Sequence, residues 1–303
     1  MKKFLVNIAL FGICLLIVDK ALILIRDQGP ELEVDKRLEF IVTGQIQNDI
    51  LIFGSSRGAR SVVADQITDS LNRTCYNLSY PGSDITFHEY LLRATLDNED
   101  NQKPSTIVLV VDDGDEFKRT VALKFRFDRM FPLVEYKAIR DELVRRNQKK
   151  WFFADILVAH QLNKDHLMFE QKKFTKRDSV MSGGSMLIWE QKKDFDYVYK
   201  SEPYIYSTQG EFDWKLKAFT EFVELCKKNN IELVIAIPPN YRVATDGFKE
   251  RVEELLDGYG TVYEFDPNIE EYKDDQYFFD NAHLLKTGAH LFTAELAEFL
   301  KDL

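Results

Sequence analysis

The sequence is poor in cysteine and histidine and has no excess of positive charge. Three cysteines among 303 residues cannot form a disulfide framework or a cysteine-rich zinc site. Fifty acidic side chains outnumber forty basic ones, for a net charge of −10, which argues against nucleic acid as a partner. No internal repeat or low-complexity tract is present. The chain as a whole is 45% hydrophobic and 30% charged. This composition is enough to bury the core of one large domain or of two small ones.

The N-terminal segment differs from the rest of the chain in its hydrophobicity. Two lysines precede an apolar run over residues 4–25, which only Asn7, Asp19 and Lys20 interrupt. As a helix this run spans roughly 33 Å, about the thickness of a bilayer core. We therefore expect residues 1–26 to be an uncleaved single-pass membrane anchor. The basic start favours an N-terminus inside and a domain outside the cytoplasm.

Three other interpretations of this segment are weaker. A cleaved signal peptide needs a small-x-small site, and residues 24–29 contain none. A lipoprotein signal needs a small residue before its cysteine, but Ile13 precedes Cys14. A buried helix of a soluble domain has one apolar stripe, whereas this run is apolar on all sides. We expect Asp19 near the far end of the span, where it reaches the interface with Lys20.

Strand and helix patterns alternate from Asp49 to the C-terminus. Short apolar runs predict strands at 50–53, 74–78, 107–111, 233–237 and 262–265. Helical periodicity separates them, at 62–71, 85–96, 212–226, 248–256 and 287–303. This alternation predicts an α/β protein, a three-layer α/β/α sandwich with a parallel sheet. We expect this α/β domain to comprise residues 49–303. A stalk or linker at 27–48 precedes it, and an insertion or cap at about 118–210 interrupts it.

A glycine and two serines follow the first predicted strand. The segment is Gly54-Ser55-Ser56-Arg57, at the edge where parallel sheets place their active residues. A hydroxyl there lies at the head of a helix, where N–H groups and the dipole favour negative charge. The alternative is that Ser55 or Ser56 only caps the helix. A phosphate-binding loop is a third option, but neither of the glycine-rich motifs typical of such loops, GxGxxG and GxxxxGK(S/T), is present.

An acid and a histidine lie three residues apart before the last predicted helix. They are Asp280 and His283. Among the five histidines, only His283 has an acid three residues earlier in a predicted loop. Such a carboxylate can hold the Nδ1–H of the imidazole, which leaves Nε2 to act as a base.

Together the two motifs resemble the SGNH (GDSL-like) hydrolase superfamily, over residues 49–303 apart from the insertion. The resemblance implies Ser56 as nucleophile, Asp280 as the residue that orients the base and His283 as the base. Asn77-Leu78-Ser79-Tyr80-Pro81-Gly82 resembles the second block of the family. It implies an oxyanion hole that contains the N–H of Gly82 together with that of Ser56.

One block departs from the family pattern. The third block, Gly-x-Asn-Asp, is replaced by Asp112-Asp113-Gly114-Asp115. An ionised carboxylate cannot donate to an oxyanion and repels it. One lost donor costs about 10²–10³ in rate, which argues against a simple esterase. Asp112, Asp113, Asp115 and Glu116 could instead be metal ligands, although a solvated turn with a helix cap explains them better.

With its Gly-Ser-Ser start, its missing Asn and its N-terminal anchor, the chain resembles extracytoplasmic members of the superfamily. These include the teichoic-acid D-alanyl transfer protein and the alginate acetylation proteins. This resemblance implies an acyl esterase or O-acyltransferase that needs no cofactor or metal. Its partners would be an acylated glycan or envelope polymer and a membrane-bound acyltransferase. The alternatives are a non-catalytic envelope binding or scaffold protein of the same fold, and a cytoplasmic metal-dependent hydrolase that uses Asp112 and Asp113.

Further residues are candidates for binding substrate. Arg57, Asp113 and His88 lie close to the predicted site residues in the sequence. For His88, an ordinary surface or core histidine is the favoured alternative. The insertion adds a locally basic and aromatic surface that could bind an anionic polymer or lipid headgroups; an ordinary solvated face is the alternative. Its residues are Arg145, Arg146, Lys149, Lys150, Lys172, Lys173, Lys176 and Arg177, with Trp151, Phe152, Phe153 and Trp189.

Overall fold

The structure, a computed structural model, describes residues 1–118, 123–150, 153, 155–168, 170–171, 175 and 178–303. The chain divides into two compact units. The anchor unit comprises Met1–Val42 and Arg126–Lys173, and the sheet unit comprises Thr43–Phe125 and Phe174–Leu303. The predicted insertion at 118–210 is thus shared between both units.

The sheet unit is built on five parallel strands, which confirms the predicted α/β class. The strands are β1 (Ile50–Gly54), β2 (Cys75–Asn77), β3 (Thr106–Val110), β4 (Glu232–Ile237) and β5 (Thr261–Glu264). They lie in the order β2-β1-β3-β4-β5, and every pair is parallel. All residues of β1 and β3 are buried, as continuous apolar strands of a sheet covered on both faces should be.

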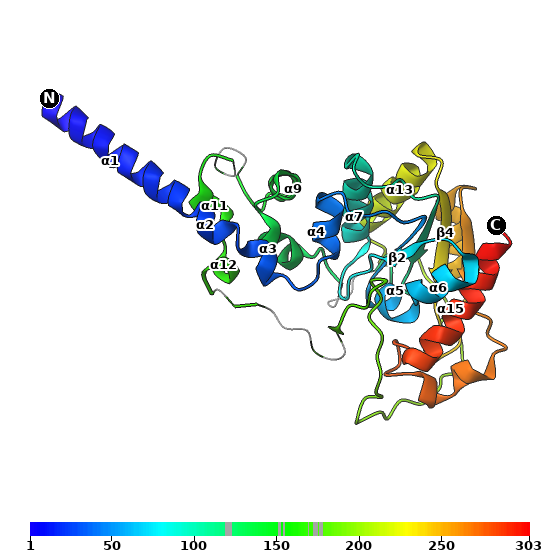
Figure 1. Cartoon of the computed structure of the whole chain (residues 1–303). Coiled ribbons are helices and arrows are strands. Elements are labelled where there is room, and N and C mark those ends of the chain that lie inside the picture. Colours follow the sequence, from blue (N-terminus) through cyan, green and yellow to red (C-terminus); the bar gives the residue numbers. More distant parts are fainter. Residues whose placement is uncertain (119–122, 151–152, 154, 169, 172–174, 176–177) are drawn as a thin grey trace. The chain divides into compact units, whose positions relative to one another are not determined.

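Helices pack on both faces of this sheet. Alternate residues such as Ile52 and Val108 join one core with apolar residues of α6 and α15. On the other face the ring of Phe53 lies 5.6 Å from that of Phe222 on α13. The helices are α5 (Ser56–Ser61), α6 (Ala64–Leu71), α7 (Ile85–Asp97), α13 (Asp213–Lys228), α14 (Phe248–Leu256) and α15 (Lys286–Lys301), with two 3₁₀ turns, η3 (Glu270–Lys273) and η4 (Asp275–Tyr277). Figure 1 shows α7 and α13 on one side of the strands and α6 and α15 on the other.

The order of the strands fixes where a site can form. The chain runs from β1 outward to β2 and then returns to place β3 on the opposite side of β1. The connections after β1 and β3 therefore diverge, and ligands of such sheets bind in the crevice at their carboxyl ends. Ser55 and Ser56 follow β1, and Asp112 and Asp113 follow β3, so both segments adjoin this crevice.

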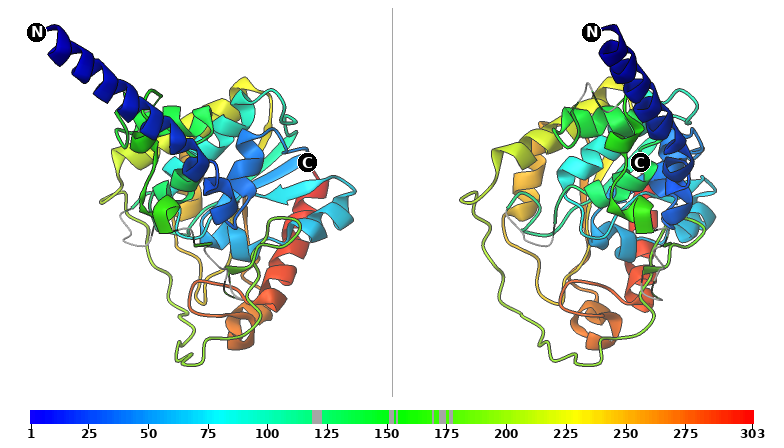
Figure 2. Two further views of the ribbon diagram at one scale, coloured as in Figure 1. Left: turned by 60° about the vertical axis from the view of Figure 1, so that its left-hand side comes forward. Right: turned by 90° about the vertical axis from the view of Figure 1, so that its left-hand side faces the viewer.

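The anchor unit joins the N-terminal helix to part of the insertion (Figure 2). Its helix α1 (Lys2–Ala21), continued through α2 and α3, is long and apolar enough to cross a membrane. The segment predicted as a stalk contains α3 (Gly29–Leu32) and α4 (Arg37–Val42). The remaining elements are α2 (Ile23–Arg26), α8 (Phe127–Met130), η1 (Phe131–Leu133), α9 (Lys137–Arg145), α11 (Val158–Gln161) and α12 (Lys164–Met168).

Candidate active site

The two serines after β1 are placed differently. One caps the following helix, and the other presents its hydroxyl at the head of that helix, so both interpretations of the segment apply. Ser55 caps α5: its Oγ accepts from the N–H of Arg57 at 3.1 Å and donates to Asp112 Oδ2 at 2.6 Å. Gly54 lets β1 approach β3 here, because a Cβ on it would lie only 2.8 Å from the carbonyl oxygen of Val110. Ser56 begins the helix, and its side chain is free for another partner.

That partner is His283, as the sequence predicted. The Oγ of Ser56 lies 2.8 Å from His283 Nε2. His283 Nδ1 lies 2.9 Å and 3.0 Å from the two carboxylate oxygens of Asp280. With Nδ1–H donated to a carboxylate, Nε2 is the acceptor for the Ser56 hydroxyl. The three side chains therefore form a continuous hydrogen-bonded relay.

Local geometry keeps Asp280 ionised. Its Oδ1 accepts from the backbone N–H groups of Ala282 and His283, both at 2.9 Å. Burial alone raises the pKa of this carboxyl, but the hydrogen bonds from His283 and from these two N–H groups lower it to about 2. The spacing of three residues folds the loop back on the aspartate, which orients the imidazole. The side chains of Asp280 and His283 are each 20% exposed, so the relay is open to a substrate.

The turn that carries Gly82 lies against the end of β1. The N–H of Tyr80 donates to the carbonyl of Gly54 at 2.9 Å, and the N–H of Ser83 donates to Tyr80 at 3.1 Å. Gly82 has φ +74, a conformation that favours glycine. Within the described part of the chain, no acceptor is bonded to the N–H of Gly82 or of Ser56. Both predicted oxyanion donors thus keep an unused N–H.

The two aspartates at the start of the segment that replaces the third block, Asp112 and Asp113, are already bonded to other groups of the protein. Asp112 accepts the Ser55 hydroxyl. Asp113 is 3% exposed and lies 3.0 Å from Arg242 Nη2, with the N–H of Thr245 at 3.3 Å. Over the described residues, no three His, Cys, Asp or Glu side chains are grouped to hold a metal ion. The predicted substrate contact of Asp113 is therefore limited, because its carboxylate is already paired.

His88 was predicted to touch substrate, and its position argues against this. The side chain has no exposed surface, and Nε2 lies 2.8 Å from Ser83 Oγ. Burial, together with the charge of Lys215, lowers its pKa to about 3, so it is neutral. His88 thus supports the turn that carries Gly82 from behind, out of reach of a substrate.

Arg57 was also predicted to bind substrate, and it too is buried. It is 2% exposed, and its Nη2 donates to the carbonyl oxygens of Pro238 and Pro239 at 2.7 and 2.9 Å. Burial lowers its pKa, while the charges of Asp112, Asp113 and Asp280 oppose that shift. The first turn of α5 directs the side chain beneath the end of β4, so Arg57 holds the connection after β4 and does not face solvent.

Glu116 is a buried acid behind the same loop. Its Oε2 accepts from the N–H of Asp112 at 2.9 Å, and its backbone carbonyl accepts from Lys215 Nζ at 2.7 Å. Burial and then the charge of Asp112 raise its pKa to about 8, and Lys215 opposes the shift. Nothing in the sequence distinguishes this acid from its neighbours, because burial inside a loop cannot be inferred from composition.

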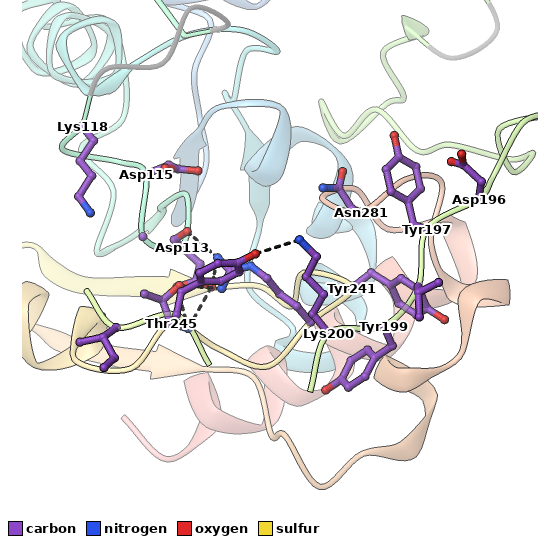
Figure 3. A pocket seen from close by; sticks show the side chains of 15 residues that line it. Asp113, Asp115, Lys118, Asp196, Tyr197, Tyr199, Lys200, Tyr241, Thr245 and Asn281 are labelled. Atoms are coloured by element: carbon purple, nitrogen blue, oxygen red, sulfur yellow. Dashed lines mark hydrogen bonds and ion pairs between the residues drawn. The ribbon is translucent and has the colours of Figure 1, made fainter. Parts of the chain in front are cut away.

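A tyrosine-lined cavity of about 800 Å³ adjoins the loop of Asp280 and His283. Asn281 of that loop lines it, and the Asn281 carbonyl accepts from the N–H of Tyr241 at 3.0 Å. Figure 3 shows Asp113, Asp115 and Lys118 on one side, and Asp196, Tyr197 and Tyr199 on the other. Sequence reasoning missed these tyrosines; their only signal was the aromatic richness of the insertion. The cavity gives the site a polar, aromatic wall.

A second cavity, of about 600 Å³, adjoins the other end of this loop. Phe279, directly before Asp280, lines it together with Ile188 and Trp189. The ammonium of Lys286 lies 4.1 Å from the centre of the Trp189 ring. Trp189, predicted as aromatic surface of the insertion, is 59% exposed. An exposed aromatic surface therefore lies close to the relay.

The predicted basic surface of the insertion is partly neutralised. Arg145 and Arg146 both pair with Glu142, each with an N–O distance of 2.6 Å. Lys149 Nζ donates to the carbonyl of His160 at 2.6 Å. Lys150 and Phe153 are exposed. The remaining predicted residues lie outside the described ones: Trp151, Phe152, Lys172, Lys173, Lys176 and Arg177.

No family model and no curated protein matches this chain. Any assignment of function therefore depends on the geometry of the site.

Proposed function

We propose that the chain is a membrane-anchored SGNH-type acyl esterase or O-acyltransferase that acts outside the cytoplasm on a cell-envelope polysaccharide. The observation that carries this proposal is the relay from Ser56 through His283 to Asp280. Its distances, 2.8 Å and 2.9 Å, are those of an activated nucleophile with an oriented base. The order of the helices and strands, with α/β/α layers, supports the same family.

The mechanism follows from the hydrogen bonds. Ser56 Oγ attacks the acyl carbonyl carbon, and its proton passes to His283 Nε2. The N–H groups of Ser56 and Gly82 stabilise the oxyanion. When the carbonyl reforms, the carbon–oxygen bond to the alcohol breaks, and His283 returns the proton to that alcohol. Water or a sugar hydroxyl then attacks acyl-Ser56 by the same steps, which frees the serine.

The tyrosine-lined cavity supports a carbohydrate as acyl donor or acceptor. Aromatic faces offer flat apolar surface, and tyrosine hydroxyls add hydrogen-bonding groups. Carboxylates, amides and amines around them suit the dense hydroxyls of a sugar. The lining includes three cationic and three acidic side chains, Lys118, Lys200, Arg242, Asp113, Asp115 and Asp196. Because these formal charges cancel, the cavity fits a neutral or zwitterionic sugar unit.

A fluorophosphonate probe tests the nucleophile directly. We expect covalent labelling of Ser56 in the full-length protein and its loss in Ser56→Ala and His283→Ala. The matched control is Ser201→Ala, which removes an exposed serine and should leave labelling unchanged. Peptide mapping that places the label on another residue, or folded protein that takes no label, would refute the catalytic assignment.

The second candidate is a non-catalytic envelope binding protein of the same fold. Asp112 favours it, since a carboxylate stands where the family has an oxyanion donor. This candidate predicts that the protein binds an acylated glycan with the same affinity in wild type and Ser56→Ala. It also predicts no release of p-nitrophenol from p-nitrophenyl acetate, with or without a glycan acceptor.

A further inference from the structure

Part of the insertion is attached to the apolar N-terminal helix at Asp19. The two carboxylate oxygens of Asp19 accept from the N–H groups of Val158 and Ala159, at 3.0 and 2.9 Å. The next residue, Lys20, donates from Nζ to the carbonyl of Ile156 at 2.6 Å. Asp19 is only 9% exposed. The acid that interrupts the apolar run is therefore bound by protein.

A third bond continues this attachment along the helix. Arg26 Nη1 donates to Gln161 Oε1 at 3.0 Å. Helix α11 contacts both α1 and α2, and α12 contacts α2, as Figure 1 shows at the base of α1. One side of residues 19–26 is thus covered by protein. The part of the helix surrounded by exposed surface is Lys2–Val18, which extends roughly 25 Å.

This attachment determines the depth of α11 in a membrane. A bilayer core is about 30 Å thick. If Lys2–Val18 crosses it, Asp19 lies at the interface, and Ile156 and Val158 must lie at the same level because they are bonded to Asp19 and Lys20. This level follows from contacts within the anchor unit alone.

Ile156 and the elements around it expose apolar side chains. Leu167 and Met168 lie farther along the helix from this level, because their neighbour His166 lies against Gly29, ten residues after Asp19. The exposed fractions are 74% for Leu24, 46% for Ile156, 58% for Leu167 and 62% for Met168. Phe153 is 39% exposed. They come from α2, from the segment before α11, and from the end of α12, which are elements that contact one another or bond to α1. Apolar side chains next to a transmembrane helix are favourable in the acyl-chain boundary of a bilayer.

We infer that Leu24, Phe153 and Ile156 form an interfacial surface that inserts into the same bilayer that α1 crosses. The occupant is phospholipid, at the level of the glycerol and the first acyl carbons. The exposed cation Lys150 lies close to Phe153 and Ile156 in sequence and favours anionic headgroups. The inference depends on the proposed anchoring by α1, and it is independent of catalysis. The insertion would then hold the anchor unit against the membrane surface.

Site-directed fluorescence in nanodiscs tests this. Cys14 is the only exposed thiol, since Cys75 and Cys226 are buried. In full-length Cys14→Ser protein, Ile156→Cys carries an environment-sensitive dye, and nanodiscs of phosphatidylglycerol and phosphatidylcholine carry a spin-labelled lipid quencher close to the glycerol. We expect blue-shifted emission and at least a twofold loss of intensity. The matched control is Val198→Cys, an exposed apolar position of the sheet unit, which should not be quenched.

A label on native Cys14 separates the two ways of failing. If Cys14 is quenched by a deep lipid probe and position 156 behaves like position 198, α1 crosses the bilayer and the interfacial surface is refuted. If neither position is quenched, the anchoring itself is refuted. A label at 156 that is shielded from water but not quenched by lipid also overturns the inference, because a protein would then cover this surface.

Discussion

The Nδ1 atom of His283 lies almost equally far from the two carboxylate oxygens of Asp280, at 2.9 and 3.0 Å. The same carboxylate accepts two backbone N–H groups of its own loop. The aspartate thus fixes both the loop and the ring, and the ring can only turn its Nε2 toward Ser56. The four consecutive residues Asp280–His283 are therefore sufficient to orient the His283 ring.

Replacement of Asp280 by Asn tests this orientation. An amide can accept the Nδ1–H only in one of its two orientations, and it cannot stabilise an imidazolium. We expect kcat for p-nitrophenyl acetate to fall by about 10³–10⁴, as such a change does in serine proteases. Asp275→Asn, which alters an acid of the preceding 3₁₀ turn, serves as control. A loss below tenfold with intact circular dichroism would contradict the assigned role.

Asp112→Asn tests the cost of the missing oxyanion donor. The Asn oxygen can still accept from Ser55, while the negative charge near the proposed oxyanion disappears. We expect kcat for p-nitrophenyl acetate to increase by about tenfold, which is the lower end of the roughly 1–4 kcal/mol that a nearby charge is worth in a partly solvated site. Asp115→Asn, on the exposed side of the same turn, should change kcat for p-nitrophenyl acetate less than twofold, because this ester does not need the tyrosine-lined cavity. An unchanged rate in Asp112→Asn would show that this carboxylate does not face the reaction.

Glu116→Gln tests the raised pKa of the buried acid. A carboxyl whose pKa is raised by folding releases its proton more readily when unfolded, so its contribution to stability is complete below the ordinary pKa of about 4.3 and declines above it. The free energy of unfolding of the Glu116→Gln variant, minus that of wild type, should therefore increase between about pH 4.5 and about pH 8. Asp112, Lys215 and Asp84 are charges that act on this group. Glu298→Gln, which replaces an exposed acid, should give a flat difference in denaturant titrations.

Tyr204 tests the sugar cavity. Its ring is 50% exposed, Lys200 Nζ lies 2.9 Å from its hydroxyl, and the guanidinium of Arg242 lies 5.0 Å from the ring centre. Loss of one aromatic face costs about 0.5–1.5 kcal/mol, so Tyr204→Ala should raise KM for a glycan acceptor by roughly 2- to 13-fold. Tyr204→Phe should retain most of the affinity if stacking dominates. Neither variant should alter hydrolysis of p-nitrophenyl acetate, and Trp214→Ala on α13 should affect neither measurement.

The strands and the Asp280–His283 pair could be predicted because their signals are local. The contact between Ser56 and His283 spans 227 residues, and only the family resemblance implied it. The run at 107–111 corresponds to β3, and the helix at 248–256 has the predicted bounds. Asp280 and His283 lie close in sequence, so their bond follows from spacing. The sequence predicted that Ser55 or Ser56 caps a helix, and Ser55 caps α5. The periodic pattern began only at residue 62, because Ser56–Ser61 has no apolar periodicity.

Burial and long-range pairing account for the errors. Arg57 was expected to meet substrate, yet it is buried by its contacts with the distant residues Pro238 and Pro239. His88 is a core histidine, which is the alternative to substrate contact that the sequence favoured. Asp19 was expected to reach water at the interface, whereas Val158 and Ala159 bind it from 139 and 140 residues away. The tyrosine-lined cavity was missed because the segments that follow β3 and β4, an irregular segment and the loop of Asp280 and His283 contribute to it together.

The long separation between Ser56 and His283 has a consequence for biosynthesis. His283 is made 227 residues after Ser56, and α15, which follows the histidine, packs on α5. Translation must therefore pass His283 before Ser56 can meet its hydrogen-bond partner. Until then the growing polypeptide carries a serine without this partner.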